Sequence, residues 1–95
     1  MRIVGKEKLF AFKLKHGDVI SQVDSWIAEV GEARWSMPLD IKRRYASASF
    51  IGNKNVVFDL KGGNYRLWTL VDYPHQIVLI KDAGTHKEYD KWKII

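Results

Sequence analysis

The chain has 95 residues, of which 46% are hydrophobic and 28% are charged, and its formal net charge is +5. This length and composition predict a single folded domain, residues 1–95, and exclude a disordered chain. The chain has no cysteine, no apolar run of the roughly 20 residues that a membrane helix needs, and no apolar signal-peptide core. We therefore expect a cytoplasmic protein without disulfides or membrane contact, and the positive charge favours a polyanionic partner.

The first third of the chain predicts two helices after a short β-prone start, Met1–Val4. The first helix spans Lys6–His16 and stops at Gly17, and Asp18 can cap the second. Apolar residues then recur at helical spacing as far as about Ala33, which marks an amphipathic helix. They are Val19, Ile20, Val23, Trp26, Ile27 and Val30. The resulting helical hairpin must bury this apolar stripe against another layer.

A third, short helix is expected over Pro38–Tyr45, with proline near its start. It carries Lys42, Arg43 and Arg44, the only dense basic run in the sequence. This run is either a solvated helix face or an RNA contact, and the sequence favours neither interpretation.

From Ala48 onwards the apolar period changes to two, which predicts strands separated by turns. The predicted strands are Ser49–Ile51, Val56–Leu60, Tyr65–Asp72 and Ile77–Ala83. They form an antiparallel meander of four strands, to which Met1–Val4 can add a fifth at an edge. The fold class is thus α+β, with two N-terminal helices packed on one face of a twisted antiparallel sheet and a short C-terminal helix. The other sheet face is left for function.

The C-terminal helix carries the polar residues that most resemble a site. Thr85 and Glu88 have the spacing of a capping box, so a helix should begin directly after a strand. His86, Tyr89 and Asp90 are spaced i, i+3, i+4 and share one face. The free N–H groups of the first turn suit a phosphate. These three side chains are either a catalytic group or ordinary polar residues of the surface.

The strand Tyr65–Asp72 places Arg66 and Trp68 on its second face. Arg66 can bind a phosphate or neutralise a phosphorane, or it can pair with Asp59 or Asp72 on the sheet. Trp68 and Tyr89 can stack on an unpaired base.

Further cations near the turn and the last helix are candidates for RNA contact. Lys61 lies before Gly62-Gly63, and it either aids phosphate binding or is simply solvated. Lys87 follows His86 on the last helix. The two glycines suit a turn with positive φ rather than a phosphate loop.

The chemistry available to the chain is acid–base chemistry. There is no Gly-x-Ser-x-Gly motif and no cysteine nucleophile. His86 and Asp90 have no evident third ligand, so we expect no metal and no cofactor. An RNA substrate supplies its own nucleophile, the 2′-hydroxyl. His86 or Tyr89 can then move protons while Arg66 stabilises the developing charge.

Several segments together resemble the HigB family of type II toxins, within the RelE/ParE-like superfamily. The resemblance runs through nearly the whole chain, and the combination of its last two motifs is fairly specific. The segments are Met1-Arg2-Ile3-Val4, Ala33-Arg34-Trp35, Pro38-Leu39-Asp40-Ile41-Lys42, Ala48-Ser49-Phe50-Ile51-Gly52, Val57-Phe58-Asp59-Leu60-Lys61-Gly62, Gly63-Asn64-Tyr65-Arg66-Leu67 and Thr85-His86-x-x-Tyr89-Asp90.

The resemblance implies a toxin that cleaves mRNA on translating ribosomes and is silenced by a HigA-type helix-turn-helix antitoxin. It also implies the α+β fold described above, with the site on the concave sheet face. Carried onto this sequence, the motif positions are Arg66, His86, Tyr89 and Asp90, with Lys61 in support. The alternative is a non-catalytic module of the ParE-like kind that acts on a protein or nucleic-acid target.

Overall fold

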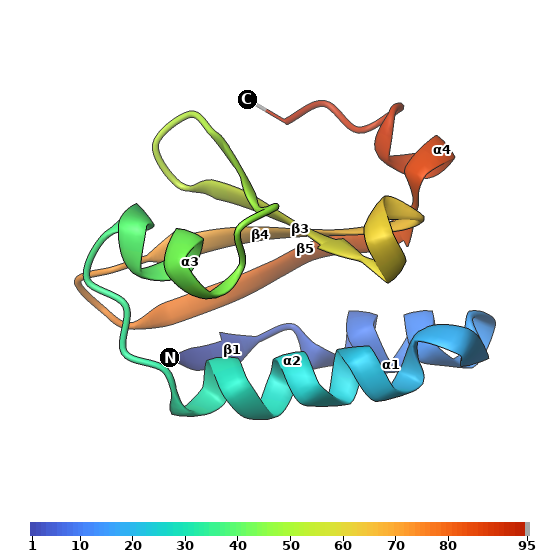
Figure 1. Ribbon diagram of the computed structural model, residues 1–95, viewed down its shortest axis with the longest axis horizontal. Helices are drawn as coiled ribbons and strands as arrows, with labels where there is room; N and C mark the ends of the chain where they lie inside the picture. Colours follow the sequence, from blue (N-terminus) through green and yellow to red (C-terminus); the bar gives the residue numbers. More distant parts are fainter. Residues whose placement is uncertain (95) are drawn as a thin grey trace.

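A computed structural model describes residues 1–94 as one sheet with helices against it (Figure 1). Within this range no helix is both long and apolar enough to cross a membrane. The elements are β1 (Arg2–Val4), α1 (Lys6–Lys15), α2 (Ile20–Glu32), α3 (Pro38–Arg44), β2 (Ser49–Ile51), β3 (Asn55–Leu60), β4 (Tyr65–Asp72), β5 (Ile77–Thr85) and α4 (His86–Tyr89). Two short 3-10 turns, η1 (Gly17–Val19) and η2 (Lys61–Gly63), connect α1 to α2 and β3 to β4.

The sheet has five strands in the order β1-β5-β4-β3-β2. The antiparallel meander from β2 to β5 is confirmed. The expectation of a fully antiparallel sheet is wrong, because β1 pairs in parallel with β5 at the edge, with Arg2 opposite Ile77. Gly5 allows the chain to leave this edge: its φ is +93°, and a Cβ there would lie 3.2 Å from the Ile80 carbonyl oxygen.

The core lies between the sheet and the helices α1 and α2, which Figure 1 shows together on one side of the sheet. Most of the predicted stripe of α2 is buried there, with Val23, Trp26 and Val30 each exposed by 3% or less, whereas Ile20 is 41% exposed. Phe58 of β3 lies at the centre of an aromatic group, 5.3 Å from Trp26 and 5.2 Å from Tyr45 between ring centroids. Burial of the α2 stripe therefore matches the apolar period that predicted it.

The junction between α1 and α2 differs from the prediction that Asp18 caps the second helix. Val19 is the N-cap of α2, and no side chain caps it. Asp18 lies in η1 instead, where its carboxylate accepts a hydrogen bond of 2.9 Å from the Tyr65 hydroxyl on β4. Both carboxylate oxygens lie near this hydroxyl, at 2.9 and 3.1 Å, and no side chain accepts from the first N–H groups of α2. The junction is thus fastened to the sheet.

Truncation of Phe58 should reveal how far the fold depends on this aromatic group. Phe58→Ala should lower the free energy of unfolding by roughly 3–5 kcal/mol, because it leaves a cavity between α2 and β3. Phe10, which is 49% exposed, provides the matched control, and Phe10→Ala should change stability by about 0.5 kcal/mol or less. Urea denaturation followed by tryptophan fluorescence measures both. Equal losses in the two variants would contradict this assignment of the core.

Candidate functional site

The register between β4 and β5 brings the two predicted motifs together. Arg66 on β4 lies opposite Gly84 on β5, and Tyr65 lies opposite Thr85. The chain passes from Thr85 directly into α4. Arg66 is therefore next to the first turn of α4, although the two segments are separate in the sequence.

Hydrogen bonds hold α4 at this position. The predicted capping box is confirmed: the Glu88 N–H donates to Thr85 Oγ1 at 3.2 Å, and the Thr85 N–H donates to Glu88 Oε1 at 2.9 Å. The His86 N–H donates to the Asn64 carbonyl at 3.0 Å, which ties α4 to the turn between β3 and β4. These bonds satisfy N–H groups at the start of a helix only four residues long.

The face of α4 that the sequence predicted is present. His86 Nδ1 lies 3.4 Å from Asp90 Oδ2, and the side chains of these two residues are 52% and 59% exposed. The rings of His86 and Tyr89 lie 6.0 Å apart. Because Asp90 contacts Nδ1, it can orient the imidazole while Nε2 stays free for another partner.

Arg66 is held on two sides. Its guanidinium lies 5.0 Å from the centre of the Tyr89 ring, and its Nη1 lies 3.0 Å from Asp59 Oδ1. The interpretation as an ion pair is thus confirmed for Asp59, whereas Asp72 pairs with His75 at 3.0 Å. This ion pair is compatible with phosphate binding by Arg66, because the side chain keeps 17% of its surface exposed and a guanidinium has five N–H donors.

Aromatic side chains extend this face away from Arg66. Trp68 donates its indole N–H to Asn55 Oδ1 at 2.8 Å. Trp92 lies 5.9 Å from Trp68 and 5.7 Å from Tyr89 between ring centroids, so it joins the two predicted aromatics. Trp92 was not among the predicted site residues, and the only signal for it was its i, i+3 spacing from Tyr89.

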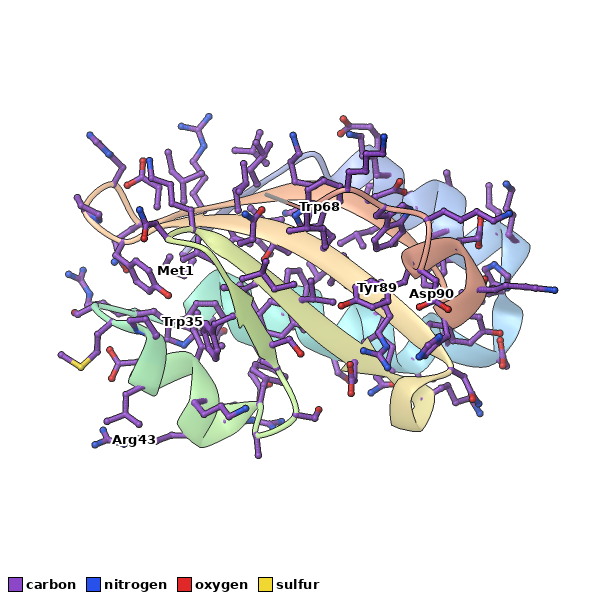
Figure 2. All side chains as sticks on the ribbon, turned by 90° about the horizontal axis from the view of Figure 1, so that it is seen from above. Met1, Trp35, Arg43, Trp68, Tyr89 and Asp90 are labelled. Carbon is purple, nitrogen blue, oxygen red and sulfur yellow. The ribbon has the colours of Figure 1, made fainter. Side chains whose placement is uncertain are left out.

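The structure places the remaining predicted cations in different surroundings. Lys87 is exposed on α4, and Lys61 is exposed in η2, where its N–H donates to Gln22 Oε1 at 2.8 Å. The basic run of α3 is not part of this cluster, and Figure 2 shows Arg43 at the opposite end of the molecule from Tyr89 and Asp90.

The three cations of α3 are mostly engaged locally. Lys42 donates to the Ala48 carbonyl at 2.8 Å, and Arg44 pairs with Glu29 at 2.7 Å. Arg43 is 71% exposed, 4.0 Å from Asp40. An RNA contact by this run stays a prediction.

The residues available for metal binding are few. Within residues 1–94, no group of three or more His, Asp or Glu side chains could hold a metal ion.

Taken together, the fold and this cluster define a small basic α+β domain with an arginine, a histidine and aromatic rings gathered beside one sheet face. A family model described as the RelE-like toxic component of a toxin–antitoxin system matches residues 20–92. The match covers more than half of the chain, which therefore belongs to the HigB toxin family. A search among curated proteins found no match.

The capping box gives α4 a dependence on pH. The backbone N–H of Thr85 lowers the pKa of Glu88 below its ordinary value of 4.5, and nearby Lys15 and His16 act in the same direction. A lowered pKa in the folded state stabilises the protein at pH values above 4.5, and this stabilisation is lost as pH falls through the folded pKa. Glu88→Gln should thus be less stable than wild type at neutral pH and equally stable in acid.

Urea denaturation of wild type and Glu88→Gln at a series of pH values tests this expectation. Glu7, an exposed acidic residue of α1, supplies the matched control variant Glu7→Gln. A stability difference for Glu88→Gln that does not change with pH would show that the carboxylate charge has no role in the cap.

Proposed function

We propose that this toxin is a metal-independent, ribosome-dependent endoribonuclease that cleaves mRNA and so inhibits translation. The observation that supports this most is the convergence of Arg66, Tyr89 and His86 on one exposed sheet face, with Asp90 against the imidazole. A cation for phosphate, a proton carrier and aromatic rings for unpaired bases are the groups that RNA cleavage requires.

The proposed reaction is a transesterification within the RNA. The 2′-hydroxyl loses its proton to a base and attacks the adjacent phosphorus, and the bond to the 5′-oxygen of the next nucleotide breaks as that oxygen gains a proton. The products are a 2′,3′-cyclic phosphate and a free 5′-hydroxyl. His86 moves a proton through Nε2, and Arg66 stabilises the charge on the phosphorane oxygens.

The charge and family of the chain suggest its partners. A net charge of +5 favours approach to ribosomal RNA and mRNA. As the toxic component of a toxin–antitoxin system, the chain should be silenced by an antitoxin, which we propose to be of the HigA type with a helix-turn-helix domain.

One observation favours a second candidate function, that of a non-catalytic toxin of the ParE-like kind. Arg66 pairs with Asp59 at 3.0 Å, so part of its charge is already neutralised within the sheet. A surface of this kind can bind a protein or nucleic-acid target without cleaving it.

Expression in a bacterial host with mapping of mRNA 5′-ends tests the proposed function. Wild type should arrest growth and produce new mRNA ends within reading frames. His86→Ala should reduce cleavage by roughly 10²–10⁴-fold if His86 is the proton carrier, and Arg66→Ala should also lose activity. Tyr89→Phe keeps the ring and should lose activity only if the Tyr89 hydroxyl moves the second proton. Circular dichroism should show that each variant stays folded.

Lys6→Ala provides the control, since Lys6 is an exposed residue of α1 to which no RNA contact is assigned, and it should retain cleavage. Growth arrest by wild type with intact mRNA would overturn the endoribonuclease proposal and favour the second candidate. Unchanged cleavage by His86→Ala and Arg66→Ala would show that the chemistry lies elsewhere on the chain.

A further inference from the structure

A second basic feature lies on the other flank of α4. It is a groove of about 300 Å³ between α1 and the end of β5. Its polar lining comprises Lys8, Lys15, His16, Lys81, Asp82 and Glu88. Neither the sequence motifs nor the proposed chemistry uses the three lysines of this groove.

The fold brings these lysines to the two walls of the groove. Lys8 and Lys15 are seven residues apart on α1 and so share one helical face. Lys81 lies across the groove at a β-bulge, because Trp68 pairs with Asp82 whereas Thr69 pairs with Ile80. The side chain of the extra residue in a bulge points in a different direction from that of a regularly paired strand residue. The Lys8 ammonium donates to the Lys81 carbonyl at 3.1 Å, which joins the two walls.

The acidic residues of the groove are already engaged by the backbone. Asp82 Oδ1 accepts the Ala83 N–H at 2.8 Å, and Glu88 Oε1 accepts the Thr85 N–H at 2.9 Å. Within residues 1–94, no ion pair involves any of the three lysines. The lining thus carries three lysines against two carboxylates, a formal excess of one positive charge, and none of these ammonium groups forms an ion pair within the described residues.

The uncharged lining argues against a protein partner at this groove. It consists of Ala11, Ala83 and Phe12, and Phe12 is only 4% exposed. Protein interfaces generally depend on large aromatic or apolar anchors at their centre, and none is available here. A cationic track without apolar anchors is suited to the phosphates of a single strand.

We infer that this groove binds backbone phosphates of the RNA strand that extends beyond the candidate site across α4. The inference rests on the proposed function, since it assigns the path of the same substrate. Two contacts connect the groove with the site: Glu88 lines the groove while its neighbour Tyr89 contacts Arg66, and the Lys81 ammonium lies 5.5 Å from the centre of the Trp68 ring.

The test measures binding of a short 2′-O-methyl RNA, which lacks the attacking hydroxyl and therefore cannot be cleaved, to the full chain at several salt concentrations. Lys15→Gln combined with Lys81→Gln should weaken binding and reduce the salt slope by roughly 1.4, because each lost phosphate contact on a single strand contributes about 0.7. The control pair is Lys6→Gln with Lys54→Gln, which removes the same charge from exposed positions outside the groove.

A smaller salt slope in the groove pair, with the control pair close to wild type, supports the inference. Equal slopes in the two pairs, or no binding of this RNA by wild type, overturn it. Loss of antitoxin binding in the groove pair with unchanged RNA binding would assign the groove to an acidic protein segment and overturn it as well. Because the RNA is uncleavable, failure of cleavage in cells contradicts the proposed function without deciding the groove.

Discussion

The pairing of β4 with β5 is the constraint on which the candidate site depends. It sets Arg66 opposite Gly84, one residue before the capping box begins. A Cβ on Gly84 would lie 3.0 Å from Glu88 Oε1 and 3.2 Å from Glu88 Cβ, so a larger residue would require the Glu88 side chain of α4 to shift. The short helix is accordingly positioned by register, close approach and hydrogen bonds, since none of its residues is buried.

Arg66 shows how one side chain links the sheet to this helix. Its ion pair with Asp59 lies across the β3–β4 pair, and its contact with the Tyr89 ring reaches α4. Both partners limit the conformations that a long flexible side chain would otherwise sample, which lowers the entropic cost of using it on a substrate. The same ion pair has an opposing effect, because a phosphate at Arg66 must share the guanidinium with the Asp59 carboxylate.

Local signals in the sequence predicted the features that depend on neighbouring residues. The stripe of α2, the capping box and the positive φ of Gly62 and Gly63 all follow from spacing or from residue type within one segment. Features that join distant segments could not be obtained in this way. The parallel pairing of β1 with β5 and the hydrogen bond from Tyr65 to Asp18 arise only once the sheet has formed.

The same distinction applies to the candidate site. Helical spacing was enough to place His86, Tyr89 and Asp90 on one face. The sequence did not decide whether Arg66 pairs with Asp59 or with Asp72. Register decides between them, because Asp59 lies directly opposite Arg66 on β3. The groove in turn arises from the packing of α1 against β5, which brings together Lys8 and Lys81, 73 positions apart in the sequence. Charge clusters that a sheet assembles therefore require the structure, while a dense run such as that of α3 attracts attention in the sequence and lies away from the site.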